Sequence, residues 1–238
     1  MKIALFGYGK MGMEIEQIAL QRGHTIALKI DVTNAETFSK DELKNCDAAI
    51  EFSTPHTAIA NMNKCFDAGV PVVVGTTGWY EKTEEVKKAC TQKNGCLFYA
   101  SNFSIGVNLF FKLNEQLARM MNSYADYNVV MEEVHHIHKL DAPSGTAISI
   151  ANQITENVKR KNKYVNAKTT KPEELEIISK REGEVPGTHT VTYKSSIDDI
   201  EIKHTAHNRK GFALGAVMAS EFIKEKKGIF GMNDMMKL

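Results

Sequence analysis

Three histidines and a lysine lie close together near the middle of the chain. His135, His136, His138 and Lys139 belong to the segment EEVHHIHKLDAPSGTA, residues 132–147. An imidazole is well suited to proton transfer near neutral pH, and a lysine adds a cation. The segment could therefore be a metal site, a proton-transfer site, an anion-binding site or a plain strand end.

The metal interpretation has little support in the sequence. A zinc site needs three or four ligands that converge on one point. In an extended strand His136 and His138 would share one face while His135 pointed the other way. No carboxylate and cysteine pair nearby completes a set, so we predict no metal. Exposure at a strand end would explain any one of these histidines, and we adopt that interpretation for His138.

The residues after the histidines favour proton transfer to an anion. Pro143 disfavours helix at the residue before it, so a helix is expected to begin near Ser144. Gly145 and Thr146 would then present backbone N–H groups and a hydroxyl at a helix N-terminus, where a carboxylate binds well. An acid or base, a cation and an anion site within a dozen residues suit a small dicarboxylate that must receive a proton.

A glycine motif near the start of the chain indicates a dinucleotide. The pattern G-x-G-x-x-G follows a predicted strand and opens a predicted helix; its members are Gly7, Tyr8, Gly9, Lys10, Met11 and Gly12. The first glycine permits a tight turn, the second leaves room for a pyrophosphate, and the third allows close packing of helix on strand. The alternative is a tight turn without a ligand.

An acidic residue strengthens the dinucleotide interpretation. Asp31 ends the second predicted strand about 20 residues past the glycines, where it would bind the ribose hydroxyls of NAD. Val32 stands where an NADP-binding site could place an arginine, but Lys29 is near enough to help with a 2′-phosphate. The choice between NADH and NADPH therefore stays open.

The first hundred residues predict an open parallel sheet. Apolar runs that begin at residues 2, 25, 48, 71 and 96 alternate with helical segments such as 10–23 and 55–69. Strand, helix, strand in repetition is typical of crossover connections, and strands covered on both faces are apolar throughout. Residues 75–78 and 100–103 follow two of these strands and would line the cofactor crevice at the carboxyl edge of the sheet.

The second part of the chain predicts an α+β unit. We expect a helix over 105–121, with leucines 109, 113 and 117 at four-residue spacing, then an extended run to His136. A helix follows with an apolar face at residues 147, 148, 151, 154 and 158, and then an exposed lysine-rich loop at 159–171. Three alternating segments after residue 174 predict antiparallel strands, with a turn near 197–199, before a last helix over 210–226 and a tail.

The composition excludes some classes of protein. The 238 residues carry a net charge of +1, so a broad electrostatic footprint for nucleic acid or an anionic membrane is absent. No segment approaches the roughly 20 apolar residues that cross a bilayer. The four cysteines form no paired motif, and we predict that they are reduced, structural residues of a cytoplasmic protein.

EVHHIHKLDAPSGTA resembles the catalytic signature of the 4-hydroxy-tetrahydrodipicolinate reductase family, also called dihydrodipicolinate reductase. The resemblance extends over the chain through GYGKMG, GTTG, ASNFSIGVN, REGEVPGTHTV and NRKGFALGA. It implies reduction of a cyclic dicarboxylate, 4-hydroxy-tetrahydrodipicolinate, to tetrahydrodipicolinate with NADH or NADPH, in lysine and diaminopimelate biosynthesis. It also implies a Rossmann-like domain at residues 1–104 and 209–238, and a substrate-binding and oligomerisation domain at 105–208 that builds a homotetramer.

The resemblance assigns roles to individual residues. His135 and Lys139 match the catalytic positions, and His136, Gly145, Thr146 and Arg209 are expected to bind substrate. The cofactor positions comprise the glycine motif, Asp31, Phe52 and two loops, whose members are Gly75, Thr76, Thr77, Ala100, Ser101, Asn102 and Phe103.

Other functions remain to be weighed. Another NAD-dependent oxidoreductase would keep the glycine motif without needing the histidine segment. A nucleotide-sensing regulator would need a DNA- or partner-binding element, and a metalloenzyme would retain its metal on purification.

Overall fold

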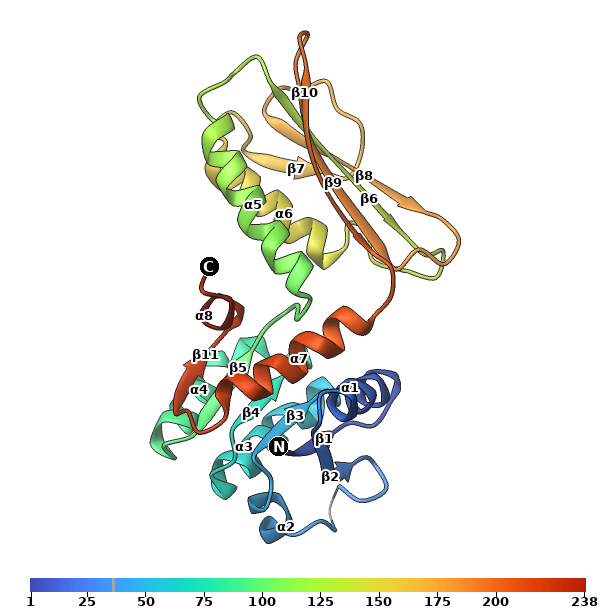
Figure 1. The fold of residues 1–238 in the computed structure, drawn as a ribbon. Coiled ribbons are helices and arrows are strands. Elements are labelled where there is room, and N and C mark those ends of the chain that lie inside the picture. The colour runs from blue at the N-terminus through green and yellow to red at the C-terminus, as the bar shows by residue number, and fades with distance from the viewer. Residues whose placement is uncertain (36) are drawn as a thin grey trace. The chain divides into compact units, whose positions relative to one another are not determined.

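The computed structural model describes residues 1–35 and 37–238. The chain divides into two compact units: unit 1 comprises Met1–Ile105 and Lys210–Leu238, and unit 2 comprises Gly106–Arg209 (Figure 1). Unit 1 is therefore discontinuous in sequence, with unit 2 inserted after its fifth strand. No described helix is long and apolar enough to cross a membrane.

Unit 1 is built on a parallel sheet of six described strands in the order β11-β5-β4-β3-β1-β2. They are β1 (Lys2–Phe6), β2 (Thr25–Ile30), β3 (Ala48–Glu51), β4 (Val72–Val74), β5 (Cys96–Tyr99) and β11 (Gly228–Phe230). The predicted parallel sheet is confirmed. The strand β11 was missed, because three residues in a C-terminal tail show no period and pair only where the edge of β5 is available.

Helices cover both faces of this sheet, as its apolar strands predicted. They are α1 (Lys10–Gln21), α2 (Lys40–Lys44), α3 (Pro55–Ala68), a 3₁₀ turn η1 (Tyr80–Lys82), α4 (Thr83–Gln92), α7 (Lys210–Ile223) and α8 (Met232–Met236). Alternate residues of β1 face opposite layers: Ala4 and Phe6 belong to the core beneath α3 and α4, while Ile3 and Leu5 belong to the core beneath α1 and α7. All four cysteines are buried and unpaired by disulfides.

Unit 2 holds a mixed sheet in the order β10-β9-β6-β8-β7. Its elements are α5 (Ile105–Met121), β6 (Asn128–His135), α6 (Gly145–Asn157), β7 (Lys163–Val165), β8 (Glu174–Arg181), β9 (Gly187–Lys194) and β10 (Asp199–Ala206). The hairpin of β9 and β10 is antiparallel, but β8 is parallel to β6 and β7. The expectation of three antiparallel strands is therefore wrong for β8, because β6 lies between β8 and β9.

The helices α5 and α6 pack on one face of the unit 2 sheet (Figure 1). The buried row of α5 is Val107, Phe110, Asn114, Ala118 and Met121, whereas Leu109 and Leu113 are 45% and 55% exposed. The four-residue spacing of the leucines therefore predicted the helix correctly but not its buried face, on which only Leu117 of the three packs against the core. Packing decides the orientation, since the amide of Asn114 donates to the carbonyl of Ile150 and to Gln153 on α6.

Two further expectations for unit 2 are corrected. In α6, Ile150 rather than Ile148 completes the fully buried face. The segment 159–171 is not simply an exposed loop: it contains β7, and its Lys161 is buried with Nζ bonded to the carbonyl of Glu174 at 2.8 Å.

Candidate active site

His135 is the last residue of β6 and lies on the face that carries the unit 2 core. The strand ends there, one residue before the expected end at His136, and residues 137–138 form a turn. The side chain of His135 is nearly buried, while His138 is exposed and pairs with Glu184 at 3.3 Å. The three histidines therefore have distinct surroundings.

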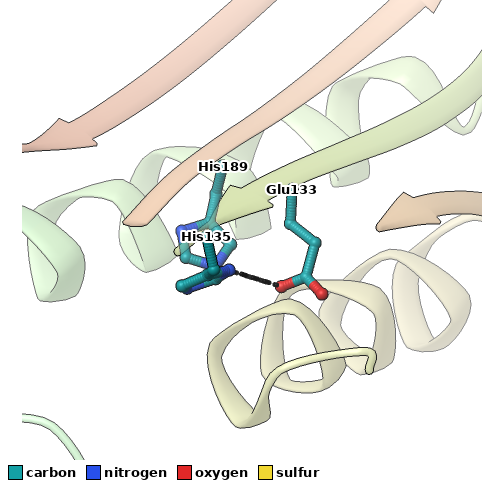
Figure 2. Close-up of side chains that lie close together, drawn as sticks. All are labelled: Glu133, His135 and His189. Atoms are coloured by element: carbon teal, nitrogen blue, oxygen red, sulfur yellow. Dashed lines mark ion pairs between the residues drawn. The ribbon is translucent and has the colours of Figure 1, made fainter. Parts of the chain in front are cut away.

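Strand register brings three side chains to His135 that sequence reasoning missed. Glu133 lies two residues earlier on the same face of β6, and it pairs across the sheet with His189 of β9 and Ser179 of β8. The rings of His135 and His189 are 5.1 Å apart, edge to face, and Figure 2 shows both beside the carboxylate of Glu133. The period of two residues could have indicated Glu133; His189 needed the pairing of β6 with β9.

The two carboxylate oxygens of Glu133 share one donor, the backbone N–H of Ser144, which lies 3.2 Å from Oε2, and otherwise have different partners. Oε1 accepts from the backbone N–H of Ser144 at 3.0 Å and from the hydroxyl of Ser179 at 2.8 Å. Oε2 lies 3.3 Å from Nδ1 of His135 and 3.7 Å from Nε2 of His189. Burial acts to raise the pKa of Glu133, but the hydrogen bonds from His135, Ser144 and Ser179 outweigh it and hold that pKa far below its ordinary value. The residue is therefore an anion.

His189 is a neutral imidazole above mildly acidic pH. Burial, followed by repulsion from His135, lowers the pKa of His189 to about 4. Its Nε2 lies 3.2 Å from the hydroxyl of Ser144. The ligand atoms of Glu133, His135 and His189 are within 4.8 Å of one another, so within the described chain this cluster could hold a metal. One oxygen of its carboxylate is already committed to two hydrogen bonds.

The helix α6 begins beside this cluster. Ser144 caps it, since its hydroxyl accepts from the backbone N–H of Ala147 at 3.1 Å. Gly145 and Thr146 follow as the first residues of the helix, Gly145 exposed and Thr146 partly so. The N-terminal N–H groups of a helix carry partial positive charge and bind anions.

Lys139 lies in the loop between β6 and α6. Its ammonium donates to both oxygens of Asp141, at 2.7 and 2.8 Å, and this bond holds the pKa of Asp141 below its ordinary value. Arg181 fixes the loop through the carbonyls of Lys139 and Asp141. The expected substrate residue His136 follows the end of β6 and is partly buried, and Arg209 is exposed just before α7.

The glycine motif has the geometry that its three roles require. Gly7 has a φ of +87°, which favours glycine, and a Cβ there would lie 2.2 Å from the carbonyl oxygen of Phe52. A Cβ at Gly12 would lie 2.3 Å from the carbonyl oxygen of Gly7, so close packing needs glycine. A Cβ at Gly9 would meet nothing within 4 Å, which leaves space beside the start of α1. These features fit a pyrophosphate at the N-terminus of α1.

A cavity lies at the carboxyl ends of β1, β2 and β3, where the strand order reverses direction. Its lining includes predicted cofactor residues and several that sequence reasoning missed, namely Phe6, Gly7, Tyr8, Gly9, Ile30, Asp31, Val32, Ala35, Phe52, Ser53, Thr54, Thr57, Ala60, Asn61 and Lys64. The switch point of an open parallel sheet is where nucleotides bind. Helix α3 supplies four of the missed residues, Thr57, Ala60, Asn61 and Lys64, and its position over β3 could not be deduced from spacing.

The two expected cofactor loops meet at Phe52. A Cβ at Gly75 would lie 2.0 Å from the Phe52 ring, and the rings of Phe52 and Phe103 are 5.7 Å apart. Thr76 is buried, and its carbonyl accepts from the indole N–H of Trp79 at 2.8 Å. Thr77, Ala100, Ser101 and Asn102 lie in the same two loops after β4 and β5.

Fold and site together define a two-domain protein with a Rossmann-like nucleotide-binding sheet and a second unit that carries a buried carboxylate–histidine cluster. Family models described as dihydrodipicolinate reductase match both parts, the N-terminus over residues 1–103 and the C-terminus over residues 106–236. The chain belongs to the dihydrodipicolinate reductase family.

Named relatives agree with this placement. The chain is 50% identical to a 4-hydroxy-tetrahydrodipicolinate reductase of Christiangramia forsetii, over 99% of this chain and 98% of the relative. It is 32% identical to the enzyme of the same name in Neisseria gonorrhoeae, over 94% and 84% of the two chains. The fold matches a dipicolinate-bound dihydrodipicolinate reductase of Paenisporosarcina sp. TG-14, with a TM-score of 0.78, 23% identity and 98% coverage of each chain.

Proposed function

We propose that this chain reduces 4-hydroxy-tetrahydrodipicolinate to tetrahydrodipicolinate with NADH or NADPH, in lysine and diaminopimelate biosynthesis. The observation that carries this conclusion is 50% identity to a reductase of that name along almost the whole of both chains. The rival functions have no comparable support. A different NAD-dependent oxidoreductase would not need the histidine segment, and a nucleotide-sensing regulator would require a further element for binding DNA or a partner.

The residues of unit 1 fit a dinucleotide. The pyrophosphate would lie over Gly9 at the start of α1, and Asp31 would accept hydrogen bonds from ribose hydroxyls. When bound, the reduced nicotinamide supplies a hydride. Phe52 and the loops at 75–77 and 100–103 would complete the cofactor site.

Residues of unit 2 would hold the dicarboxylate and supply the proton. One carboxylate would bind the N–H groups of Gly145 and Thr146, with His136 and Arg209 as further substrate contacts. Addition of a hydride builds negative charge on a ring that already carries two carboxylates, and the ammonium of Lys139 would stabilise it. His135 would act as acid or base, buried at the end of β6 and only ten residues from the start of α6.

We infer a preference for NADH over NADPH. Val32, beside Asp31, is 89% exposed and offers no charge to a 2′-phosphate. Lys29, the cation considered for that role, is instead held by Glu16 at 2.8 Å and by the hydroxyl of Tyr8 at 3.2 Å. A phosphate would have to compete with a carboxylate for this ammonium.

We also propose the domain roles, assembly and location. Residues 1–104 and 209–238 would bind the cofactor, and residues 105–208 would bind substrate and form a homotetramer. The sheet face opposite α5 and α6 supports this assembly, because Val130, Ile178 and two threonines lie there among charged side chains, with none of the helices described for unit 2 covering them. A biosynthetic role favours the cytoplasm.

A coupled spectrophotometric assay tests the function. A synthase that condenses pyruvate with aspartate semialdehyde supplies the substrate, and the absorbance of NADH or NADPH should fall when the chain is added. His135→Gln and Lys139→Met should each lower kcat by about 10²-fold or more while the thermal unfolding temperature stays near that of the wild type. No turnover with either cofactor would contradict the function, and near-normal kcat in both variants would contradict the assigned roles.

A further inference from the structure

The carboxylate of Glu133 joins the two halves of the substrate site in unit 2. The residue is 1% exposed and lies within the sheet, between the acid or base histidine and the first turn of α6. Oε1 holds the backbone N–H of Ser144, the residue before Gly145 and Thr146, and Oε2 faces Nδ1 of His135 at 3.3 Å (Figure 2). One side chain thus contacts both the proton-transfer group and the anion-binding helix.

The two nitrogens of His135 are not equivalent. Nδ1 is fully enclosed and makes no hydrogen bond within the described chain, and the carboxylate of Glu133, 3.3 Å away, is its anionic neighbour. A carboxylate accepts hydrogen bonds and cannot donate one when ionised. Glu133 therefore favours the tautomer of His135 that carries hydrogen on Nδ1. In this tautomer Nε2 has no hydrogen and is the nitrogen available for proton exchange.

We propose that Glu133 is a positioning residue that fixes the tautomer and orientation of His135 and, through Ser144, places the first turn of α6 beside it. The inference rests on the proposed function, since it needs His135 to be the acid or base. Neutral His189 packs on the other side of Oε2, and Arg181, 3.6 Å from Oε1, is the nearby cation on β8. The carboxylate can therefore direct its second oxygen to His135 without competition from a charged imidazole.

Glu133→Gln tests the inference because it exchanges one atom for another of the same size. Oε1 accepts from Ser179 and is the nearer acceptor of the Ser144 N–H, at 3.0 Å against 3.2 Å for Oε2, so the amide oxygen should take the position of Oε1 and the amide NH₂ that of Oε2. An NH₂ group donates to Nδ1 and would force hydrogen onto Nε2, the wrong tautomer. We expect kcat to fall by about 10²-fold or more, with KM changed by less than about threefold.

A double variant separates this role from a general one. If Glu133 acts through His135, the kcat of Glu133→Gln/His135→Gln should equal that of His135→Gln alone, because the second change has nothing left to remove. A double variant slower by the full factor of Glu133→Gln would overturn the proposal, as would Glu133→Gln with normal kcat while His135→Gln is impaired. Failure of wild-type turnover would instead reject the proposed function.

Glu174→Gln is the matched control. Glu174 is also a buried carboxylate of unit 2, 6% exposed, but it pairs with Lys163 at 3.1 Å and Lys171 at 3.4 Å at the start of β8. Its loss should lower the unfolding temperature and leave kcat within about twofold. Equal losses of kcat in the two variants would mean that the effect of Glu133→Gln is general destabilisation.

The tautomer can be measured in the wild-type protein itself. In protein labelled with ¹⁵N-histidine, long-range ¹⁵N–¹H spectra should show hydrogen on Nδ1 of His135 in the wild type, with His135→Gln used only for assignment. Hydrogen on Nε2 and a bare Nδ1 would overturn the proposal even if Glu133→Gln did not fold. So would a stoichiometric metal in the purified protein whose removal abolishes activity, because the imidazole and carboxylate would then be ligands.

Discussion

At the scale of single residues, Lys29 shows how a neighbour changes the meaning of a charge. By sequence it is a cation two residues before Asp31 and available to a 2′-phosphate. In the fold its ammonium lies 2.8 Å from Glu16 and 4.6 Å from the centre of the Tyr8 ring, and Tyr8 also hydrogen-bonds Glu16. These bonds raise the pKa of Lys29 and keep its charge occupied.

Glu16→Gln should therefore shift the cofactor preference toward NADPH. Removal of the carboxylate frees the charge of Lys29 for a 2′-phosphate, and we expect the ratio of kcat/KM for NADPH to that for NADH to rise about tenfold, the equivalent of about 1.4 kcal/mol. Steady-state kinetics with both cofactors measure the ratio. The gain should disappear in Glu16→Gln/Lys29→Gln; its persistence there, or a wild type that already prefers NADPH, would refute this account.

His189 should make stability depend on pH. Its folded pKa of about 4 lies below the ordinary 6.5, so the unfolded chain binds a proton that the folded chain does not in the window between these values. Stability from this source is fully present above about pH 6.5 and is lost as pH falls toward 4, to a total of about 3 kcal/mol. Urea unfolding at several pH values gives the free energy of unfolding as a function of pH. Between pH 4 and 6.5 this free energy should change less steeply with pH in His189→Gln than in the wild type. An equal dependence on pH in the two proteins would contradict the assignment.

At the scale of elements, the turn between β1 and α1 contains one glycine that is needed for packing and another that leaves room for the cofactor. Gly12 is required for packing, because a Cβ would approach the backbone of Gly7 within 2.3 Å. Gly9 has an ordinary φ of −81° and open space where its Cβ would lie. Stability should therefore depend on Gly12, and cofactor binding on Gly9.

Gly12→Ala should consequently affect stability, and Gly9→Ala should affect cofactor binding. Without cofactor, Gly12→Ala should destabilise the chain by about 2 kcal/mol or more through overpacking, while Gly9→Ala should leave the unfolding temperature nearly unchanged. Gly9→Ala should instead raise the KM for NADH at least about tenfold, because its methyl group occupies the place proposed for the pyrophosphate. Calorimetry and kinetics measure the two effects, and a Gly9→Ala enzyme with normal KM would argue against that placement.

At the scale of the whole molecule, the open face of the unit 2 sheet is the surface on which assembly is proposed. Two of its charged residues, Lys180 and Glu132, pair with each other at 2.7 Å, and Val130 and Ile178 lie among these side chains as apolar contacts for another copy. The helices α5 and α6 cover the other face of this sheet, so the side chains on the open face are suited to packing against a second sheet.

Light scattering after size exclusion should give about 106 kDa, four times the 26.6 kDa of one chain. Val130→Arg should reduce this mass to about that of a dimer or monomer, because it places an unpaired charge in the centre of the proposed interface. Leu113→Arg, on the exposed face of α5, serves as the control and should keep the wild-type mass. A wild-type mass near that of one chain would refute the tetramer.

The amino-acid sequence by itself determined the alternation of strands and helices in unit 1, the bounds of α5, the glycine turn and the start of α6. These follow from local periods and from turn and cap residues. Only the tertiary structure placed His189 beside Glu133 and His135, turned Leu109 and Leu113 outward, and bound Lys29 to Glu16. Such contacts depend on strand register and on which helix face packs, and these are settled by partners distant in the sequence.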